Sequence, residues 1–366
     1  MRDVRVASRR VASRVVAMAR AIPSAMTRVD AAPSASASAR ASSATRRHAL
    51  MFAWLGLIHV DVAVTALAVW TLPSAMAVTA LATLVAAAAI PRTVATPRWG
   101  ARLARAVTRT ATAYFPTRLE FEDEEAYLRA VRNEEACVIG LEPHGVLPLS
   151  VISFAEYFMH DEEGARRRGL TPAARRGARA LASAAIFKVP LVKHLWTWLG
   201  LDPISKACML RMLRAGKTAV IIPGGVAECM AMERGVETLY LRKRYGFVKI
   251  AIVTGAKLIP AYTFGQSRTY GYWRLGPPIV PKFVADWIGK TFSFAPIIFW
   301  GKFCTPIPYA TALNTVVGKP IEVEKNPDPS KEEVQAKLDE FIDAMRSLYD
   351  SHKARFGYED VRLVIC

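Results

Sequence analysis

Cysteine is scarce in this chain of 366 residues, and its five cysteines are scattered, with no C-x-x-C pair among them. Their number and spacing exclude a disulfide framework and give no sign of a zinc site, which fits a protein whose bulk faces a reducing cytosol. Several catalytic signatures are missing as well. The sequence has no G-x-S-x-G nucleophile elbow, no H-E-x-x-H, no P-loop and no glycine-rich dinucleotide fingerprint after a strand. Their absence argues above all against a serine hydrolase.

Acidic residues are nearly absent from residues 1–47, which contain ten arginines and only two acidic residues, Asp3 and Asp30. This segment supplies +8 of the net charge of +18. Its richness in Arg, Ala and Ser resembles an organellar transit peptide, and a disordered cytosolic tail is the alternative. The rest of the chain is moderately basic, as expected for a body that lies against anionic headgroups or phosphates. No zinc-finger or RNA-binding signature is present, so we expect no nucleic-acid partner.

Charged residues are also missing from residues 49–90, where His59 and Asp61 are the only ionisable side chains. As one helix this stretch would extend about 63 Å, roughly twice the ~30 Å hydrocarbon core of a bilayer. We therefore expect two membrane segments, 49–72 and 74–90, joined at Pro73. Arginines flank both sides, so the positive-inside rule predicts a hairpin with both ends in the cytosol. A single tilted span or a buried helix pair is the alternative.

From about residue 100 the pattern changes to that of an α/β domain. Short apolar runs bounded by Gly and Pro predict strands at 137–140, 218–222, 258–264 and 315–318. Ser330 and Glu333 form a capping-box signature. The helix that follows has an apolar face, made of Val334, Leu338, Phe341, Ile342, Met345 and Tyr349. We divide the chain into a basic tail (1–47), a transmembrane hairpin (48–91) and a cytosol-facing α/β domain (92–366).

The first candidate site is Glu142-Pro143-His144-Gly145, which directly follows a predicted strand. In open α/β sheets, ligands bind at the carboxyl ends of strands. Pro143 restricts the backbone and Gly145 permits close approach, which would hold His144 out of the core. A histidine near its ordinary pKa accepts a proton from an alcohol at neutral pH. From these residues alone, a catalytic base and a turn-capping histidine are equally good interpretations.

The second candidate site is Pro223-Gly224-Gly225, again at the end of an apolar strand and followed by Glu228. Backbone N–H groups at paired glycines bind phosphates or the oxyanion of a tetrahedral intermediate. Glu228 would then orient His144 or hold a substrate hydroxyl. A plain turn is the alternative for this motif taken alone.

Two further groups are weaker candidates for substrate binding. The cluster Arg242-Lys243-Arg244 suits phosphate groups, and a solvated or headgroup-facing basic surface is an equally good interpretation. Gln266 and Ser267 follow the predicted strand that ends at Phe264. We expect both to line the site with polar groups.

The candidate sites described above and several other short stretches, given at the end of this paragraph, resemble the type 2 diacylglycerol acyltransferase family in sequence and in order. The resemblance runs from about residue 49 to the C-terminus. Glu142 stands where animal and fungal members usually carry a second histidine, which makes the chain similar to the plant and algal branch. The matching stretches are residues 114–116, 142–145, 194–200, 223–228, 264–267, 299–301, 306–309, 317–322, 325–327, 352–355 and 357–358.

The resemblance implies an endoplasmic-reticulum enzyme that transfers a fatty acyl group from acyl-CoA to diacylglycerol, giving triacylglycerol and CoA. It implies a membrane-anchored glycerolipid-acyltransferase-like α/β domain, lipid-droplet association and no metal or bound cofactor. The family's essential histidine corresponds to His144, and its Pro-Gly-Gly-x-x-Glu block to residues 223–228. In wider glycerolipid acyltransferases an Asp follows the catalytic His by five residues. Here that position is Leu149, so Glu228 is the expected orienting acid, ahead of Glu142.

In the expected mechanism, His144 takes the proton of the acceptor hydroxyl while N–H groups near Gly224 and Gly225 stabilise the oxyanion. The acceptor stays open between diacylglycerol, monoacylglycerol and a long-chain alcohol that would give wax esters. A non-catalytic lipid-droplet protein is the alternative from another class. A plastid location, if residues 1–47 are a transit peptide, and a homo-oligomer also stay open.

Overall fold

The computed structural model describes residues 37–92, 96–154, 178–190, 192–274, 281, 283 and 297–366. Most of the predicted basic tail, residues 1–36, lies outside the described residues. The chain divides into two compact units, Met1–Thr45 and Arg46–Cys366. The second unit holds the sheet and the candidate site.

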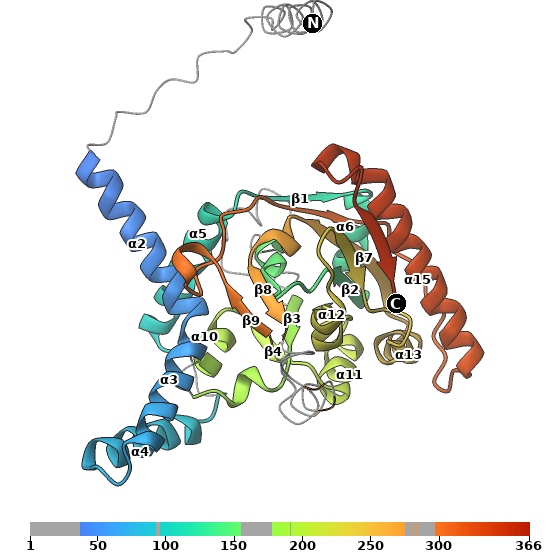
Figure 1. The fold of residues 1–366 in the computed structure, drawn as a ribbon. Helices are drawn as coiled ribbons and strands as arrows, with labels where there is room; N and C mark the ends of the chain where they lie inside the picture. The colour runs from blue at the N-terminus through green and yellow to red at the C-terminus, as the bar shows by residue number, and fades with distance from the viewer. Residues whose placement is uncertain are drawn as a thin grey trace, which may run out of the picture. The chain divides into compact units, whose positions relative to one another are not determined.

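A seven-stranded mixed sheet forms the centre of this unit (Figure 1). Neighbouring strands are parallel, except that β10 runs antiparallel to β7. Their order across the sheet is β1 (Thr117–Phe121), β10 (Leu313–Val317), β7 (Lys257–Phe264), β2 (Cys137–Glu142), β5 (Thr218–Ile221), β3 (Ala178–Ala182) and β4 (Leu201–Pro203). The four strands predicted from the sequence are β2, β5, β7 and β10. All four are confirmed to within two residues at each end, and they lie side by side in the sheet.

Side chains that alternate along β2 and β7 build a hydrophobic core on each face of the sheet. On one face, Ile139 and Ile259 pack with α5 (Arg98–Tyr114) and α10 (Val192–Trp198). On the other face, Val138 and Leu258 pack with α11 (Lys206–Arg214), α13 (Tyr245–Thr254) and α15 (Lys331–His352). At Gly140 a Cβ would lie 2.6 Å from the ring of Phe341, so only glycine lets α15 pack this closely on β2.

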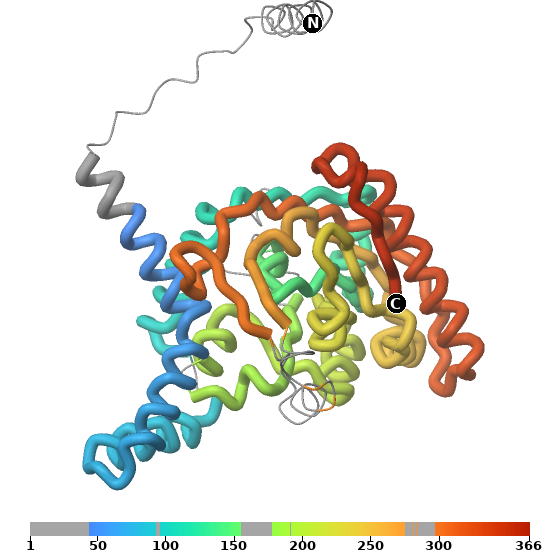
Figure 2. Tube along the Cα trace, viewed as in Figure 1, coloured from blue at the N-terminus to red at the C-terminus, as the bar shows by residue number. Residues whose placement is uncertain are grey.

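Helix α15 confirms the predicted C-terminal helix. Ser330 Oγ accepts a hydrogen bond from the Glu333 N–H at 3.0 Å, and all six residues of the predicted apolar face are buried. The return half of the capping box does not form, because the Glu333 carboxylate accepts from Asn326 Nδ2 instead. After α15 the chain ends in β11 (Arg362–Ile365), which lies beside β6 (Val236–Leu239) as a parallel pair (Figure 2).

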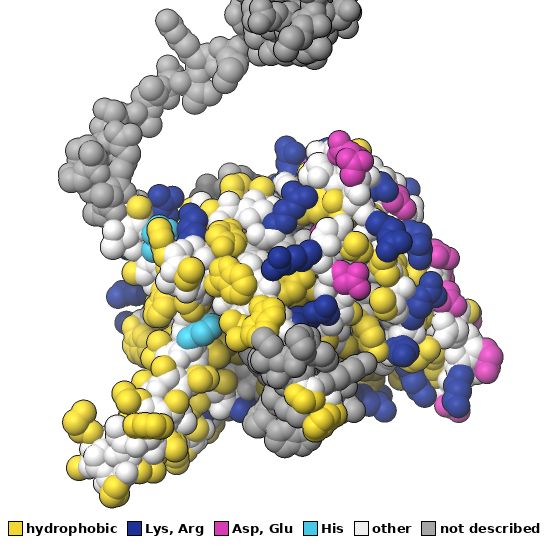
Figure 3. Space-filling view, viewed as in Figure 1, with side chains coloured by type: hydrophobic (Ala, Val, Ile, Leu, Met, Phe, Trp, Pro, Cys, Tyr) yellow, Lys and Arg dark blue, Asp and Glu magenta, His cyan; other side chains and the backbone are white. Residues whose placement is uncertain are grey.

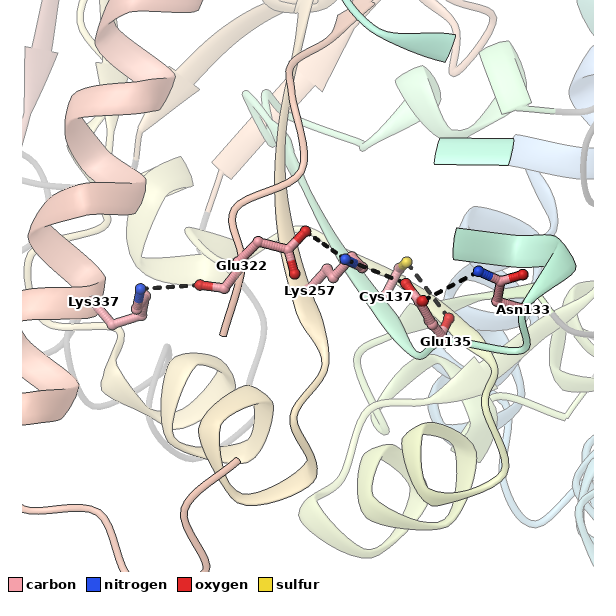
Figure 4. Close-up of polar contacts among 6 residues, drawn as sticks. All are labelled: Asn133, Glu135, Cys137, Lys257, Glu322 and Lys337. Carbon is pink, nitrogen blue, oxygen red and sulfur yellow. Dashed lines mark hydrogen bonds and ion pairs between the residues drawn. The ribbon is translucent and has the colours of Figure 1, made fainter. Parts of the chain in front are cut away.

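A polar network ties the strands together at the amino ends of β2 and β7 (Figure 4). Lys257 Nζ lies 3.2 Å from Glu135 and also pairs with Glu322. Lys337 of α15 donates to the carbonyl oxygen of Glu322 at 3.1 Å. These partly exposed pairs are worth little individually, so we assign them to register rather than to stability. The candidate site lies at the opposite, carboxyl ends of the strands.

Two apolar helices, α3 (Leu57–Trp70) and α4 (Ala75–Ala89), pack against each other across a turn that contains Pro73. The first predicted segment, 49–72, is bent by 63° where Gly56 separates α3 from α2 (Ala37–Leu55). Within the described part of the chain, no single helix is long and apolar enough to span a membrane. Helices α2 and α3 reach that length and apolarity only when they are taken together across the bend. The expected multi-pass arrangement is therefore not supported. A buried helix pair does not fit either, because Trp70 and Met76 are 87% and 85% exposed.

Candidate active site

Three neighbouring parallel strands end at the candidate site. Strand β2 leads into Pro143-His144-Gly145, β5 into Pro223-Gly224-Gly225, and β7 into Gly265-Gln266-Ser267. Since β7, β2 and β5 are parallel neighbours, their carboxyl ends meet at one edge of the sheet. The structure thus brings together both predicted motifs, which are about 80 residues apart in the sequence.

Two buried glutamates connect the loops after β2 and β5. Glu142 accepts a hydrogen bond from the Gly224 N–H at 2.8 Å, and Glu228 accepts one from the His144 N–H at 2.5 Å. The second oxygen of Glu228 accepts from the Tyr240 N–H at 3.1 Å. Glu142, the last residue of β2, therefore holds the turn after β5, and Glu228, three residues beyond that turn, holds the loop after β2. We call this arrangement the Glu142–Glu228 brace.

We assign one shared proton to the brace. Burial raises the pKa of Glu142 well above its ordinary range, and the neighbouring Glu228 raises it further. Burial raises the pKa of Glu228 to about 7, opposed by the hydrogen bonds from the His144 and Tyr240 N–H groups. As a carboxylate, Glu142 would leave Oε2 without a donor among the described residues. A proton on Oε2 would let Glu142 donate to Glu228, so we assign the acid to Glu142, whose pKa is raised well above its ordinary range, and the carboxylate to Glu228.

The brace differs from the role expected for Glu228. Its carboxylate contacts the backbone N–H of His144 and not the imidazole ring. The ring nitrogen Nδ1 instead lies 2.9 Å from the Gly145 carbonyl oxygen and 3.1 Å from Cys229 Sγ. Because a carbonyl oxygen only accepts, we assign the proton to Nδ1, which leaves the lone pair on Nε2. A backbone carbonyl thus fixes the tautomer that an orienting acid was expected to fix.

His144 is partly buried at the site. Desolvation by burial lowers the pKa of its imidazole, and the hydrogen bond to the Gly145 carbonyl opposes that shift. The ring is therefore neutral at physiological pH, which is the state a general base requires.

Cys229, whose thiol also contacts the Gly145 carbonyl at 3.2 Å, is a site residue that was not predicted from the sequence. A lone cysteine after Glu228 carries no signal that it would reach a ring 85 residues away.

The Pro-Gly-Gly turn also differs in one respect from the expectation. The Gly224 N–H is already used by Glu142, so it is not available to an oxyanion. The N–H groups that remain at this turn are those of Gly225 and Val226, at the start of α12 (Gly225–Ala231). At Gly224 a Cβ would lie 2.0 Å from a Glu228 carboxylate oxygen, so this glycine is required by the brace itself.

The other predicted site residues divide into two groups. Gln266 is buried and holds the loop after β2, because its amide nitrogen donates to the carbonyls of His144 (3.2 Å) and Leu147 (2.6 Å). Arg244 donates to the Gly224 carbonyl and lines the pocket described below. Arg242 and Lys243 are exposed and line neither of the two pockets described below.

An apolar pocket of about 440 Å³ has His144 in its wall. Pro223, Gly225, Val226 and Cys229 line it from the Pro-Gly-Gly side. Most of its surface is hydrocarbon, as a fatty acyl chain requires. The apolar lining comes from α2, α5, the segment after Gly145, α10 and β9 (Ile297–Trp300), and includes Trp54, Val107, Ala111, Leu147, Ile152, Trp196, Ile297 and Phe299.

A second pocket, of about 290 Å³, borders the same loops. Pro143, Gly145 and Glu228 form part of its wall, and Ser267 lies there as well. Ser267 Oγ donates to the buried carboxylate of Glu237 at 2.5 Å, so the hydroxyl of this predicted lining residue is already hydrogen-bonded to another side chain of the domain. Charged side chains are more frequent here than in the apolar pocket.

Comparison with known proteins agrees with the motifs brought together here. Residues 70–366 match the family model described as Diacylglycerol acyltransferase. The chain belongs to this family. The resemblance to this family is therefore confirmed, and the plant and algal branch stays a prediction.

Three relatives show the range of named activities in the family. The chain is 36% identical over 191 residues to the Diacylglycerol O-acyltransferase 2-like protein 6 of Mus musculus (47% of this chain, 55% of the relative). It is 32% identical over 233 residues to the Acyl-CoA wax alcohol acyltransferase 2 of Mus musculus (61% and 67%). It is 28% identical over 285 residues to the Diacylglycerol O-acyltransferase 2 of Homo sapiens (74% and 70%). The chain thus spans about half the length of the first of these relatives.

A solved acyltransferase structure is also similar. This is the 1-acyl-sn-glycerophosphate (LPA) acyltransferase PlsC from Thermotoga maritima, with a TM-score of 0.37 and 11% sequence identity. The match covers 84% of this chain and 97% of that one.

Proposed function

We propose that this protein is an acyl-CoA-dependent acyltransferase that esterifies the free hydroxyl of diacylglycerol, giving triacylglycerol and CoA. One observation carries the proposal: His144, with Nδ1 held by the Gly145 carbonyl, lies in the wall of an apolar pocket beside the Pro-Gly-Gly turn. A base of this kind accepts the proton of an alcohol, and the pocket suits long hydrocarbon chains.

The reaction proceeds by direct transfer. The acceptor oxygen attacks the thioester carbonyl carbon while its proton passes to Nε2 of His144. The N–H groups of Gly225 and Val226 stabilise the oxyanion of the tetrahedral intermediate. The C–S bond then breaks, the ester forms, and the thiolate of CoA takes the proton back from His144. The reaction needs acyl-CoA as a co-substrate and no bound cofactor.

The Glu142–Glu228 brace and Gln266 act on this chemistry through the backbone. They hold the two strand-end loops at a fixed separation. His144 can then reach the attacking hydroxyl while the N–H groups of Gly225 and Val226 reach the carbonyl oxygen of the same thioester. Arg244, with the exposed Arg242 and Lys243 nearby, is placed to attract the phosphates of CoA. Pro143, Gly145, Pro223 and Ser267 shape the walls of the two pockets.

The proposed location is the endoplasmic-reticulum membrane, with passage to lipid droplets, and the apolar helices α3 and α4 provide the anchor. The same family contains a relative named for wax alcohols at 32% identity, so a long-chain alcohol is the second candidate acceptor. Monoacylglycerol is the third. A plastid location stays the minority alternative.

A competition assay tests the proposed acceptor. Microsomes from a host that lacks its own triacylglycerol synthesis, expressing the full chain, receive labelled long-chain acyl-CoA with equal amounts of diacylglycerol, monoacylglycerol and hexadecanol. We expect most of the label in triacylglycerol. Label found mainly in diacylglycerol would identify monoacylglycerol as the acceptor, and label found mainly in wax ester would identify the long-chain alcohol. Label in no ester above the empty-vector control would contradict the proposed function.

A further inference from the structure

A loop after β9 presents an aromatic ring to the exterior. Phe303 is 78% exposed, and both Phe303 and Cys304 have left-handed backbone conformations, with φ of 57° and 54°. Residues with a side chain adopt this conformation at a cost in free energy, and they keep it only where the surrounding structure imposes it. At this exposure, little of the Phe303 ring is packed against the protein to offset that cost.

The surrounding structure does impose the shape of this loop. The Gly301 N–H donates to the Thr305 carbonyl at 2.8 Å, and the Lys302 N–H donates to the Ile307 carbonyl at 2.7 Å. Two tyrosine hydroxyls from the body of the domain hold the chain just beyond. Tyr114 donates to the Pro308 carbonyl at 2.5 Å and Tyr270 to the Pro306 carbonyl at 2.8 Å. The segment 301–308 is therefore a fixed support for Phe303.

The loop of Phe303 joins an apolar surface through β9 and a basic segment through α2. Hydrophobic side chains cover α3 and α4 and continue over the β8–β9 pair, where Trp273 of β8 (Gly271–Arg274) and Ile298 of β9 are 40% and 49% exposed (Figure 3). The ring of His48 contacts that of Phe303, and the exposed Arg46 and Arg47 directly precede His48 in α2. Acidic side chains gather on the part of this face near α15 instead (Figure 3).

We propose that Phe303, Trp273 and Ile298 form a second membrane contact, separate from α3 and α4, in which Phe303 inserts at the boundary between headgroups and acyl chains. Aromatic and aliphatic side chains bordered by arginine and lysine are typical of a surface that lies in the interface of an anionic membrane. Arg46, Arg47 and Lys302 meet the headgroups. Continuity with the exposed apolar helices favours a lipid surface over a second copy of the chain.

This contact also has a consequence for the apolar pocket. Ile297 and Phe299, which line the pocket, lie on β9, the strand that leads directly into the loop of Phe303. Trp54 lines the pocket from α2, the helix that carries Arg46 and Arg47. The proposed contact therefore places this wall of the pocket against the membrane, from which a lipid acceptor is taken. This second part rests on the proposed enzymatic function, whereas the contact itself rests only on the proposed membrane association of α3 and α4.

The contact is tested by fluorescence without any use of catalysis. Cys304 and Cys366 are the exposed cysteines of the described chain, so C366S leaves Cys304 for an environment-sensitive fluorophore. We use the full-length protein in phosphatidylcholine vesicles containing anionic phosphatidylserine, with nitroxide-labelled lipids as quenchers. We expect a blue shift and quenching at Cys304, and neither at a control label in S347C/C304S/C366S, since Ser347 lies on the exposed face of α15. An unquenched Cys304 label, or one shielded only by a second labelled copy, would overturn the proposal.

Activity assays on charge variants test the consequence for the pocket. F303E should lower transfer to long-chain diacylglycerol in vesicles about three- to tenfold and leave transfer to a dispersed short-chain diacylglycerol unchanged, because only the former is taken from a bilayer. F303W, which keeps an aromatic ring, should retain the wild-type activity on vesicles. S347E is the matched control for charge and should leave the activity on both acceptors unchanged. Equal losses on both acceptors would contradict the proposed delivery from the membrane. Inactivity of the wild-type protein on every acceptor would count against the proposed function and leave the fluorescence test intact.

Discussion

Glu142, at the end of β2, holds the loop after β5, and Glu228, just beyond that loop, holds the loop after β2: Glu142 accepts a hydrogen bond from the Gly224 N–H, and Glu228 accepts one from the His144 N–H. The two loops follow adjacent parallel strands, and both carboxyl groups are fully buried. Removing either side-chain acceptor altogether leaves a buried N–H without a partner, which costs about 1–3 kcal/mol. The brace therefore couples the position of the catalytic histidine to that of the Pro-Gly-Gly turn.

Glutamine variants should distinguish the two members of the brace. In E142Q the amide oxygen still accepts from Gly224 and the NH₂ group donates to Glu228, as the protonated acid does. Its kcat/KM should stay within about threefold of wild type. In E228Q the NH₂ group faces either the His144 or the Tyr240 N–H, so one buried donor loses its acceptor, and kcat/KM should fall about 10- to 100-fold. Equal losses in both variants, or the opposite order, would show that the proton is not on Glu142.

The same proton predicts how stability depends on pH. A carboxyl group whose pKa is raised in the folded state binds more protons there than in the unfolded chain, so stability falls as pH rises above the ordinary glutamate range. Between about pH 5 and 8 the melting temperature of the detergent-solubilised wild type should fall more steeply than that of E142Q, which lacks the strongly raised group. Thermal unfolding followed by intrinsic fluorescence measures both. Parallel profiles would argue against a shared proton.

Burial of His144 predicts the acid limb of the pH–rate profile. Because desolvation lowers the pKa of the imidazole, the ring stays neutral, and active as a base, below the ordinary value of 6.5. The acid limb of kcat/KM for the purified enzyme should therefore have its midpoint below pH 6.5. A midpoint above 6.5 would mean that the ring is stabilised as imidazolium, contrary to the environment described here.

Glycine substitutions test the packing of the Pro-Gly-Gly turn. In G224A the new methyl group would collide with the carboxylate of Glu228, so acyl transfer should fall at least about 100-fold through displacement of the brace. Gly246, on the nearby α13, has open space around its Cβ position and a backbone conformation that any residue adopts. G246A is the matched control and should keep wild-type activity. An active G224A enzyme at wild-type protein levels would show that the brace is dispensable.

The central strands were predictable from the sequence because buried parallel strands are continuous apolar runs bounded by Gly and Pro. Strand β1 was not, since its residues are half-buried and give no such run. The bend at Gly56 was also missed, because a single glycine in an apolar stretch is compatible with a continuous helix. That bend separates the expected first membrane segment into two helices.

At the site, the residue types were identified but their partners were not. His144, Glu142, Glu228 and the glycines stand out because each follows an apolar strand. Which carboxylate meets which N–H group depends on how two loops more than 80 residues apart meet at the sheet edge, and no local pattern encodes this. The expectation that Glu228 orients the imidazole was reasonable chemistry, but the Gly145 carbonyl occupies that position.

The central claim is that the imidazole of His144 is the general base. H144A tests it cleanly, because the brace binds the backbone N–H of this residue and alanine keeps that group. The variant should reach wild-type levels in microsomes and convert acyl-CoA and diacylglycerol to triacylglycerol about 10²- to 10⁴-fold more slowly. Triacylglycerol synthesis near the wild-type rate, at equal protein level and in a host without its own enzymes, would contradict the account.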